Sequence, residues 1–453
     1  PLSPMPSLKP IHPFTQKPHR TLISLSIPVL ISMTAEPLTA LIDTAFVASL
    51  GSVSLAALGV GTTLLSSLFW VFNFLSIGAQ TEVAQADGEG HPEKAGGIAS
   101  LSLTMAAGFG LLLILLILPN ANWLATLMGA SGDVGAEAVS YMQIRTYGAP
   151  ALLLMMVAFG VLRGLQDMRT PLWIALGMNA LNILLDWLLV FGIGVFPAMG
   201  VAGSALASTI SHWLGALIGL LVVATKLGLS FSFTFKDVKR LLSVGGDLFV
   251  RTGLLTFFLA YTTRAATQIG ADAGAAHQAI RQVFIFTGLA LDAYATTVQS
   301  LVGYFIGRDS LVWAKKVVSV GAKWSLGTGI ILGMLMWFGR EIVIDILVPA
   351  SAITVFIPAW AVSALTQPIN SIAFLSDGAH WGTGDYRFLR NAMIAAVLVG
   401  IVGVSLVDLN SSNPLFWIWI ATAFWSSTRA VFGWLRVSPG IGNSPFREQI
   451  LDN

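Results

Sequence analysis

PVLISMTAEPLTALIDTAFVASLG, residues 28–51, is the stretch from which the rest of this sequence can be interpreted. It is apolar enough to lie in a membrane, yet it contains Glu36 and Asp43. A carboxylate inside a bilayer costs about 2.5 kcal/mol or more, so it is rare and faces a cavity or a partner. The two acids are close to two helical turns apart and share one helix face. Pro28 precedes them and predicts a hinge, because proline removes a backbone hydrogen bond. We expect a movable helix that binds a cation.

The composition is that of a membrane protein. The 453 residues are 55% hydrophobic and 10% charged, with a mean hydropathy of +0.79, whereas soluble proteins carry about 25% charged residues. We predict an all-α polytopic membrane protein. The net charge of +2 gives no information about nucleic-acid binding, since the charges lie in loops, and the absence of cysteine excludes disulfides. Residues 1–20 are basic and proline-rich, lack the apolar segment of a secretory signal, and are expected to form a cytoplasmic tail.

Twelve stretches are long enough to cross the bilayer, which takes roughly 20 apolar residues. Turn and charge signals separate them. Lys and Arg are concentrated in the tails and in the loops after even-numbered stretches, which predicts that both termini are cytoplasmic. The expected spans are about 21–48, 53–84, 97–119, 138–162, 171–195, 201–225, 241–268, 273–305, 317–339, 351–379, 390–408 and 413–436.

The two halves of the chain repeat one another. An offset of 219 positions brings Gln80 onto Gln299 and Gly88 onto Gly307, and an offset of 218 brings GLQDMR (164–169) onto GTGDYR (382–387). Chance matches of Gly and Ala in an apolar chain would not explain the Gln, Asp and Arg matches. Six spans in each half give both halves the same orientation, so we predict two six-helix lobes related by a parallel pseudo-two-fold axis. The expected domains are a tail (1–20), an N-lobe (21–225), a cytoplasmic linker (226–240), a C-lobe (241–436) and a second cytoplasmic tail (437–453).

The acids do not follow the repeat. Under the same offsets Asp43 coincides with Thr262 and Asp186 with Val404. Helix packing alone gives no reason for acids in one lobe only. A coupling site that is present in one lobe and absent from the other explains them. A carboxyl in apolar surroundings gains a proton more readily, so Asp43 or Asp186 is predicted to exchange a proton near neutral pH. Asn182, one turn before Asp186, is expected to hydrogen-bond its carboxylate. In the alternative, purely structural interpretation, Asp186 and Asn182 pin helices together.

Other polar residues in the spans are weaker candidates. Glu36 is expected to line a cavity. Ser208 in the sixth span offers a hydroxyl, although the small residues around it also favour close helix packing. Candidates for the wall of a substrate cavity are Asp292, Asp377, Arg281 and Arg145. The structural alternatives are a solvated helix terminus for Asp377, and counter-ion or interfacial roles for Arg145, Arg251 and Arg281.

Catalytic motifs are missing from the sequence. We find no Walker A motif, no H-E-x-x-H and no G-x-S-x-G, and there is no histidine cluster. We therefore predict no enzymatic activity, no catalytic residue, no metal and no cofactor. Among the functions of a polytopic membrane protein, ion-coupled secondary transport is the one that these absences leave. We expect H⁺ as the coupling ion, with Na⁺ as the alternative.

These motifs resemble those of the MATE (multidrug and toxic compound extrusion) transporters and, within them, the DinF-like branch. PLTALIDTAFVASLG (37–51), followed by SVSLAALGVG (52–61), is similar to the opening signature of that branch, and LNILLDWLLV (181–190) to its fifth-helix motif. IRTYGAP (144–150) and GVAGSALAS (200–208) are similar too, although glycine-rich motifs are weak alone. The resemblance covers about residues 20–437.

The resemblance implies two six-helix lobes around a V-shaped cavity, and antiport in which H⁺ or Na⁺ enters as an organic compound leaves. It implies that Asp43 is the main proton site and that Asp186 and Asn182 complete its network. Ser208 lies where the family has a hydroxyl, usually that of Thr.

Two further positions carry over from the family. The resemblance implies that protonation bends the first helix at Pro28. Asp377 matches the tenth-helix acid of the NorM-like branch, but the seventh span (241–268) lacks the mid-span acid of that branch. This departure favours coupling in the N-lobe over a Na⁺ site in the C-lobe.

We predict a secondary antiporter that exports small cationic or amphiphilic organic compounds in exchange for H⁺ by alternating access, with protonation of Asp43 and Asp186 coupled to substrate release. The alternatives are an exporter of citrate-like organic acids, a Na⁺-coupled drug antiporter and, ranked lower, a lipid flippase or a membrane scaffold. Membrane lipid and a small organic substrate are the expected partners, without nucleic acid, and the expected assembly is a monomer. The expected location is a bacterial inner (plasma) membrane, and a plastid envelope is the alternative.

Overall fold

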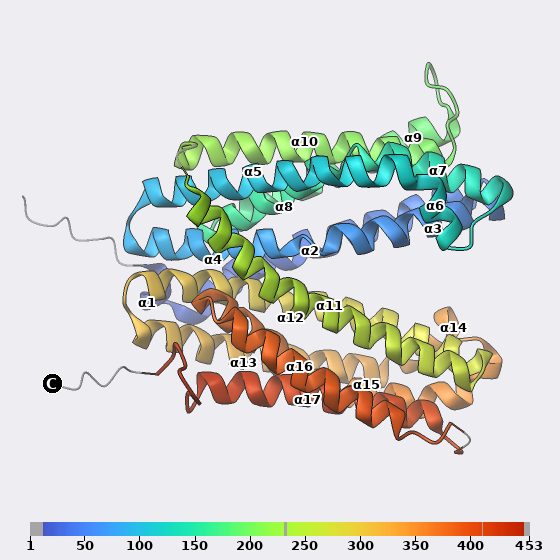
Figure 1. The fold of residues 1–453 in the computed structure, drawn as a ribbon. Coiled ribbons are helices and arrows are strands. Elements are labelled where there is room, and N and C mark those ends of the chain that lie inside the picture. The colour runs from blue at the N-terminus through green and yellow to red at the C-terminus, as the bar shows by residue number, and fades with distance from the viewer. Residues whose placement is uncertain (1–11, 231–232, 410, 448–453) are drawn as a thin grey trace, which may run out of the picture.

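The chain is helical throughout the part that can be described. The computed structural model describes residues 12–230, 233–409 and 411–447, and every regular element in these ranges is a helix (Figure 1). The helices are α1 (Pro13–Gln16), α2 (Pro18–Ala48), α3 (Ser52–Trp70), α4 (Asn73–Glu89), α5 (Pro92–Ile117), η1 (Leu118–Asn120), α6 (Ala121–Leu127), α7 (Gly132–Thr146), α8 (Ala149–Gly164), α9 (Arg169–Phe191), α10 (Val201–Leu227), α11 (Phe235–Ile269), α12 (Ala271–Gly307), α13 (Leu311–Phe338), α14 (Arg340–Leu347), η2 (Ala350–Ala352), α15 (Ile353–Thr383), α16 (Tyr386–Ser405) and α17 (Pro414–Val437).

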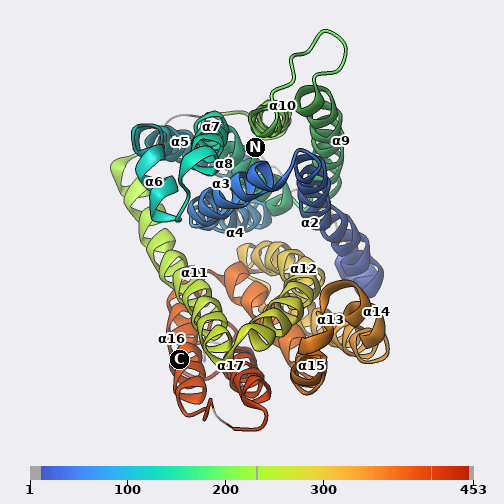
Figure 2. The same ribbon diagram turned by 90° about the vertical axis from the view of Figure 1, so that its right-hand side faces the viewer.

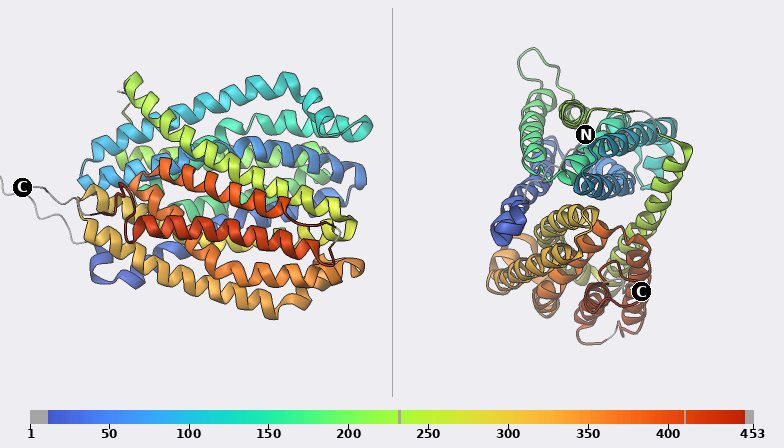
Figure 3. Two further views of the ribbon diagram at one scale, coloured as in Figure 1. Left: turned by 60° about the horizontal axis from the view of Figure 1, so that its bottom comes forward. Right: turned by 90° about the vertical axis from the view of Figure 1, so that its left-hand side faces the viewer.

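The helices form two lobes, which lie one above the other in Figure 1. Helices α2 to α10 make the N-lobe and α11 to α17 make the C-lobe. Viewed end-on, the two groups are distinct, with α2 and α11 running along their opposite flanks (Figure 2 and the right-hand view of Figure 3). With α3 and α4 taken together, and α7 and α8 taken together, the described residues contain the twelve spans predicted from the sequence. The predicted fold class, an all-α polytopic membrane protein with two six-helix lobes, is confirmed.

Apolar length alone identifies fewer spans than this arrangement contains. Within the described ranges, nine helices are long and apolar enough to cross a membrane, or ten if the bent pair of α7 and α8 counts as one span. The remaining two spans are α12 and α17, which bury polar side chains such as Thr297 and Arg429. A side chain that faces another helix rather than lipid can be polar. Such side chains lower the mean hydropathy of a span, so a test based on mean hydropathy misses α12 and α17.

The N-terminal region is more ordered than a free tail. Helix α2 begins at Pro18, where the missing N–H of proline leaves no intrahelical bond unmade. Before it, α1 packs Phe14 with no exposed surface, and the Nε2 of His12 lies 2.6 Å from the Oε1 of Gln166. Residues 12–20 therefore differ from the tail expected at 1–20.

The expected linker is also shorter in the structure. Helix α11 begins at Phe235, inside the range expected for a linker, because Thr234 and Asp237 form a capping box. In Figures 1 and 3, α11 runs obliquely from the side of the N-lobe to the C-lobe. It packs against α4 in the N-lobe and against α12, α16 and α17 in the C-lobe.

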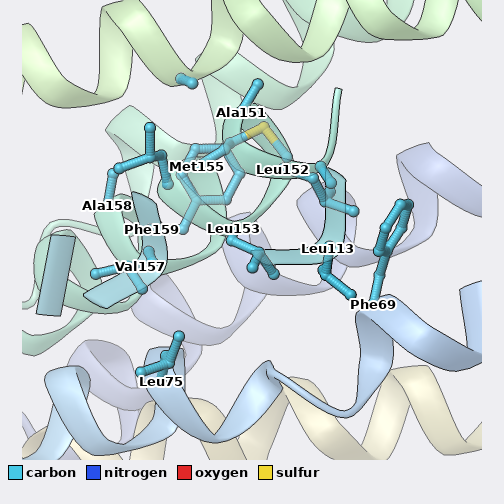
Figure 4. Packing of buried hydrophobic residues seen from close by; sticks show 14 of the residues in the cluster. Phe69, Leu75, Leu113, Ala151, Leu152, Leu153, Met155, Val157, Ala158 and Phe159 are labelled. Carbon is cyan, nitrogen blue, oxygen red and sulfur yellow. The ribbon is translucent and has the colours of Figure 1, made fainter. Parts of the chain in front are cut away.

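The core of the N-lobe is built on α8. Its residues from Ala149 to Met155 are all buried, and Phe159 packs in the same cluster with Phe69 of α3 and Leu113 of α5 (Figure 4). Lipid tails are as apolar as these side chains, so in a membrane close packing stabilises such a cluster more than exclusion of water does.

The lobes meet at one end of the bundle, which holds α1 and the last turn of α17 and is called the termini end below. There the Nε2 of Gln80 donates to the carbonyl of Thr296 at 2.8 Å, and the Nε2 of Gln299 donates to the carbonyl of Ile77 at 2.9 Å. Both donors and both acceptors are related by the sequence offset of 219. The junction thus has the pseudo-two-fold symmetry predicted from the repeat.

Two glycines let the backbones touch at this junction. A Cβ on Gly88 would overlap the carbonyl oxygen of Tyr304, and a Cβ on Gly307 would overlap that of Gln85. Gly88 and Gly307 are equivalent under the repeat, as are Gln85 and Tyr304. Helices α4 and α12 therefore cross at a point where neither tolerates a side chain.

Helix α2 also contacts both lobes, on the side of the molecule opposite α11 (Figure 2). Near the termini end, Leu22 packs in a C-lobe cluster, and the Oγ of Ser26 donates to the Oγ1 of Thr297 at 3.1 Å. Further along, α2 packs on α9 of the N-lobe. Pro28 lies between these two regions, inside a helix that is continuous through it.

Candidate functional site

Two acids from different helices meet in the N-lobe. Asp43 of α2 and Asp186 of α9 have their carboxyl groups within hydrogen-bonding reach of each other. Asp186 has no exposed surface. Among the described residues, no donor makes a hydrogen bond of good geometry to either Asp186 oxygen or to Oδ1 of Asp43. Two adjacent carboxylates repel each other, and one shared proton removes this repulsion and supplies the missing hydrogen bond. The arrangement is therefore suited to binding a single proton.

Several other side chains surround this acid pair. Ser204 of α10 lies beside the carboxyl of Asp186. Tyr141 and Arg145 of α7 are both buried, and the charge of Arg145 attracts both Asp43 and Glu36. The sequence analysis missed Tyr141 and Ser204. The available signal for Tyr141 was its position one helical turn before Arg145, which places both on one face of α7.

Asn182 lies close by but does not bond Asp186 as expected. Its Nδ2 donates to the Oγ of Ser208, at 3.4 Å. The carbonyl of Ser208 lies 2.6 Å from the Nδ1 of His212, and the Nε2 of His212 has no partner among the described residues. Ser208 thus accepts two hydrogen bonds, one at its carbonyl from His212 and one at its hydroxyl from Asn182. These bonds fix the polar side chains of this turn of α10 next to the acid pair. His212 was not identified from the sequence.

Glu36 and Pro28 lie on the same helix as Asp43. Glu36 keeps an exposed side chain although it lies in an apolar helix, and Arg145 is its nearest counter-charge. Pro28 is buried at the point where α2 changes from C-lobe to N-lobe contacts. A bend at this proline would move Glu36 and Asp43 relative to α9.

The C-lobe acid Asp377 has quite different surroundings. It is 4% exposed, and its Oδ2 accepts hydrogen bonds from Arg251 and from Arg429, the latter at 2.7 Å. The guanidinium groups also lie over aromatic rings, that of Arg251 over Trp381 at 5.2 Å and that of Arg429 over Trp425 at 4.7 Å. A solvated helix terminus, considered above for Asp377, is wrong because two arginines hold the carboxylate inside the lobe. Arg429 was missed by the sequence analysis.

Asp292 and Arg281, the other C-lobe candidates, do not join the acid pair of the N-lobe. The charges nearest to Asp292 are Asp377 and the arginines that surround it, together with Arg163 of the N-lobe. The Nε of Arg281 is buried without a partner among the described residues. The structure thus brings together Asp43, Asp186 and Arg145 in one lobe and Asp377 and Asp292 in the other.

No protein group suited to a resident metal stands out. In residues 12–230, 233–409 and 411–447, no cluster of three or more His, Cys, Asp or Glu side chains could hold a metal ion.

Two repeated helical lobes, crossing backbones at one end and ionisable groups buried between spans define an integral, multi-pass membrane protein with the architecture of a secondary transporter. The MatE family model matches residues 28–188 and 248–405, so the chain belongs to the MatE family. Its members are transporters rather than enzymes, and the chain is a multidrug and toxic compound efflux transporter of this class.

The chain is similar to curated relatives and to solved structures over most of its length. It is 28% identical to Protein DETOXIFICATION 44, chloroplastic, of Arabidopsis thaliana, covering 93% of this chain and 82% of the relative. It is 29% identical to DNA damage-inducible protein F of Escherichia coli, covering 84% of each chain, in agreement with the DinF-like resemblance. A mutant of the Vibrio cholerae MATE transporter VcmN has the same fold, with a TM-score of 0.88 at 17% identity over 96% of this chain and 100% of that one.

Proposed function

We propose that this protein is an H⁺-coupled antiporter that exports small cationic or amphiphilic organic compounds. The observation that supports this most directly is the contact between the Asp43 and Asp186 carboxyls, three of whose oxygens make no hydrogen bond of good geometry to a described donor. A proton is the smallest ligand that satisfies such a pair.

The proposed cycle links proton binding to release of the exported compound. In the outward-facing state, Asp43 accepts a proton and shares it with Asp186, and the loss of negative charge weakens the hold on a cationic compound. The inward-facing state releases the proton and reloads. Because proton and substrate oppose each other at one site, their coupling is reciprocal. The inter-lobe bonds of Gln80 and Gln299 at the termini end support an outward-facing state.

The orientation in the membrane is part of the proposal. The Lys and Arg distribution supports a cytoplasmic termini end, with the protein as a monomer in a bacterial inner membrane. The name of the Arabidopsis relative places that protein in the chloroplast, which keeps a plastid envelope as the alternative. Membrane lipid and the exported compound are the proposed partners, without nucleic acid, and H⁺ is the only coupling ligand.

The test is ethidium efflux from proteoliposomes that contain the full chain, under either an imposed pH gradient or an imposed Na⁺ gradient. We expect efflux driven by the pH gradient alone, and a loss of tenfold or more in Asp43→Asn and in Asp186→Asn. Asp272→Asn is the matched control, since Asp272 is an exposed acid at the start of α12 and should keep full efflux.

Each other outcome rejects a defined part of the proposal. Full efflux in Asp43→Asn would reject coupling through the N-lobe acids. Efflux driven only by Na⁺ would keep the transporter and reject the proton. Citrate transport without any ethidium efflux would replace the cationic substrate with an organic acid.

A further inference from the structure

A basic pocket at the termini end is separate from the acid pair. It has a volume of about 560 Å³ and lies between the start of α11 and the loop from α15 to α16. Three basic side chains line it, namely Lys236, Lys239 and Arg387, and all three are exposed. None of the three has an ion pair or hydrogen bond with another described residue.

The acids of this pocket are already neutralised by other partners. Asp247 pairs with Arg390 at 2.6 Å, and Asp385 pairs with Arg436 at 2.8 Å. The three basic side chains, which have no partner among the described residues, therefore give the pocket a local excess of positive charge. An adjoining pocket contributes Glu82 and Lys94, and Lys94 is already paired with Glu89 at 2.7 Å.

A buried hydroxyl provides a second feature of a binding site. Tyr386 lines both pockets and is 6% exposed, and its hydroxyl lies beside Thr81 without making a hydrogen bond of good geometry to any described residue. A buried hydroxyl without a partner is costly unless something absent from the protein itself satisfies it. A phosphate group offers acceptor oxygens to the hydroxyl, to both ammonium groups and to the guanidinium at once.

The pocket also lies where the two lobes are joined. Tyr386 and Leu389 of α16 and Val244 of α11 pack in the core cluster of the N-lobe, although both helices belong to the C-lobe. Gly245 of α11 lies against the ring of Phe74 in α4. A ligand in the pocket therefore contacts elements whose packing holds the termini end closed.

We propose that this pocket binds the phosphate-bearing headgroup of an anionic lipid and thereby stabilises the closed termini end. A row of basic residues at the membrane surface attracts anionic headgroups by about 1 kcal/mol for each Lys or Arg, and basic pockets between membrane helices on the cytoplasmic side bind them specifically.

The test measures thermal unfolding and native mass spectra of the full chain titrated with phosphatidylglycerol, with phosphatidylcholine as the neutral lipid. Wild type should retain phosphatidylglycerol and unfold at a higher temperature. A variant with Lys236→Gln, Lys239→Gln and Arg387→Gln should bind it about 100-fold more weakly, from the loss of three charges. Tyr386→Phe, which removes only the hydroxyl, should weaken retention by a smaller factor.

A matched variant with the same loss of charge elsewhere separates the pocket from general attraction. Arg169, Lys316 and Arg447 are exposed basic residues outside the pocket, and their replacement by Gln should leave lipid retention unchanged. Equal weakening in this control, or no preference of wild type for phosphatidylglycerol, would overturn the proposal. Glycerol 3-phosphate is the probe for a soluble source: stabilisation by this probe at the same concentration as the lipid would keep the phosphate site and overturn the lipid assignment.

Discussion

In the N-lobe the carboxyls of Asp43 and Asp186 meet without a donor in good geometry, whereas in the C-lobe two arginines hold Asp377. The two sites do not lie on equivalent helices. Asp43 and Asp186 are on α2 and α9, whose counterparts in the repeat are α11 and α16, whereas Asp377 is on α15, the counterpart of α8. A carboxylate with two guanidinium partners has its charge balanced by the protein. A carboxyl that faces another carboxyl can be balanced only by something that arrives, such as a proton. The same scaffold therefore makes one lobe responsive to protons and gives the other a fixed internal ion pair.

The largest effect is expected on removing the balanced acid. Asp377→Leu removes the carboxylate to which Arg251 and Arg429 donate hydrogen bonds, and loss of one partner of a buried ion pair costs about 3–5 kcal/mol. The melting temperature of the purified protein in detergent should fall sharply.

A triple variant controls for the loss of the ion cluster itself. Asp377→Leu combined with Arg251→Met and Arg429→Met removes the ion pair on both sides and leaves Asp292 with Arg163 as its counter-charge, so it should recover most of the stability. An unchanged melting temperature in Asp377→Leu would mean that the arginines do not depend on Asp377, and it would contradict the contrast between an ion-paired acid in the C-lobe and an unbalanced acid pair in the N-lobe.

The second-largest loss of stability is expected at the crossing of α4 and α12, and it should be equal in the two lobes. Gly88→Ala and Gly307→Ala each place a methyl group on a carbonyl of the facing helix, and such overpacking costs about 1–3 kcal/mol. Their melting temperatures should fall by similar amounts. Gly108→Ala and Gly327→Ala are matched controls, since they are equivalent under the repeat and a Cβ there meets nothing within 4 Å. Unequal losses would show that the junction is less symmetric than its backbone.

A smaller effect on stability is expected at the acid pair. In Asp186→Asn the amide N–H can donate to Asp43 in place of the shared proton, so the free energy of unfolding should change by less than about 1 kcal/mol. Chemical or thermal unfolding in detergent measures this directly. A loss as large as that of Asp377→Leu would show that Asp186 is mainly a structural residue, which would also weaken the proton proposal.

These contrasts define what the sequence could and could not reveal. The spans and the two lobes follow from apolar length and from a repeat that survives at polar positions. The repeat showed that Gln80 and Gln299 are equivalent, but not that they bond across the two lobes. The isolated acids Asp43 and Asp186 could be selected because a carboxyl is costly in lipid. Arg429 could not be paired with Asp377 in advance, because the bond joins α15 and α17 and the register between two helices depends on packing. For the same reason, the sequence suggested a bond from Asn182 to Asp186, whereas the three-dimensional arrangement directs Asn182 to Ser208.

The smallest expected effect concerns His12, which contacts both lobes outside the membrane spans. Its ring lies 4.7 Å from that of Tyr304 in the C-lobe, and it bonds Gln166 in the N-lobe. Burial lowers the pKa of His12 from 6.5, although the bond to Gln166 opposes this shift, and the charge of Arg308 adds to it. The packed segment thus binds fewer protons than the released one, so its docking is strongest above about pH 6.5 and weakens as the pH falls below that value.

Limited proteolysis of the N-terminal segment at pH 7.5 and pH 5.5 measures this dependence. Cleavage should be faster at pH 5.5 in the wild type, after correction for the protease on an unfolded substrate. In His12→Gln the difference between the two pH values should vanish. A difference that persists in this variant would assign the pH dependence to another group.

The contact between Gly88 and Gly307 is also a point about which α12 can rotate relative to α4. Gly307 is the last residue of α12, a helix of 37 residues, which at 1.5 Å per residue is about 55 Å long. While the crossing stays closed, a rotation of about 10° around it displaces the far end of that helix by about 10 Å. Because Gly88 and Gly307 place this contact at one end of α12, a small rotation there becomes a large displacement at the opposite end of the molecule.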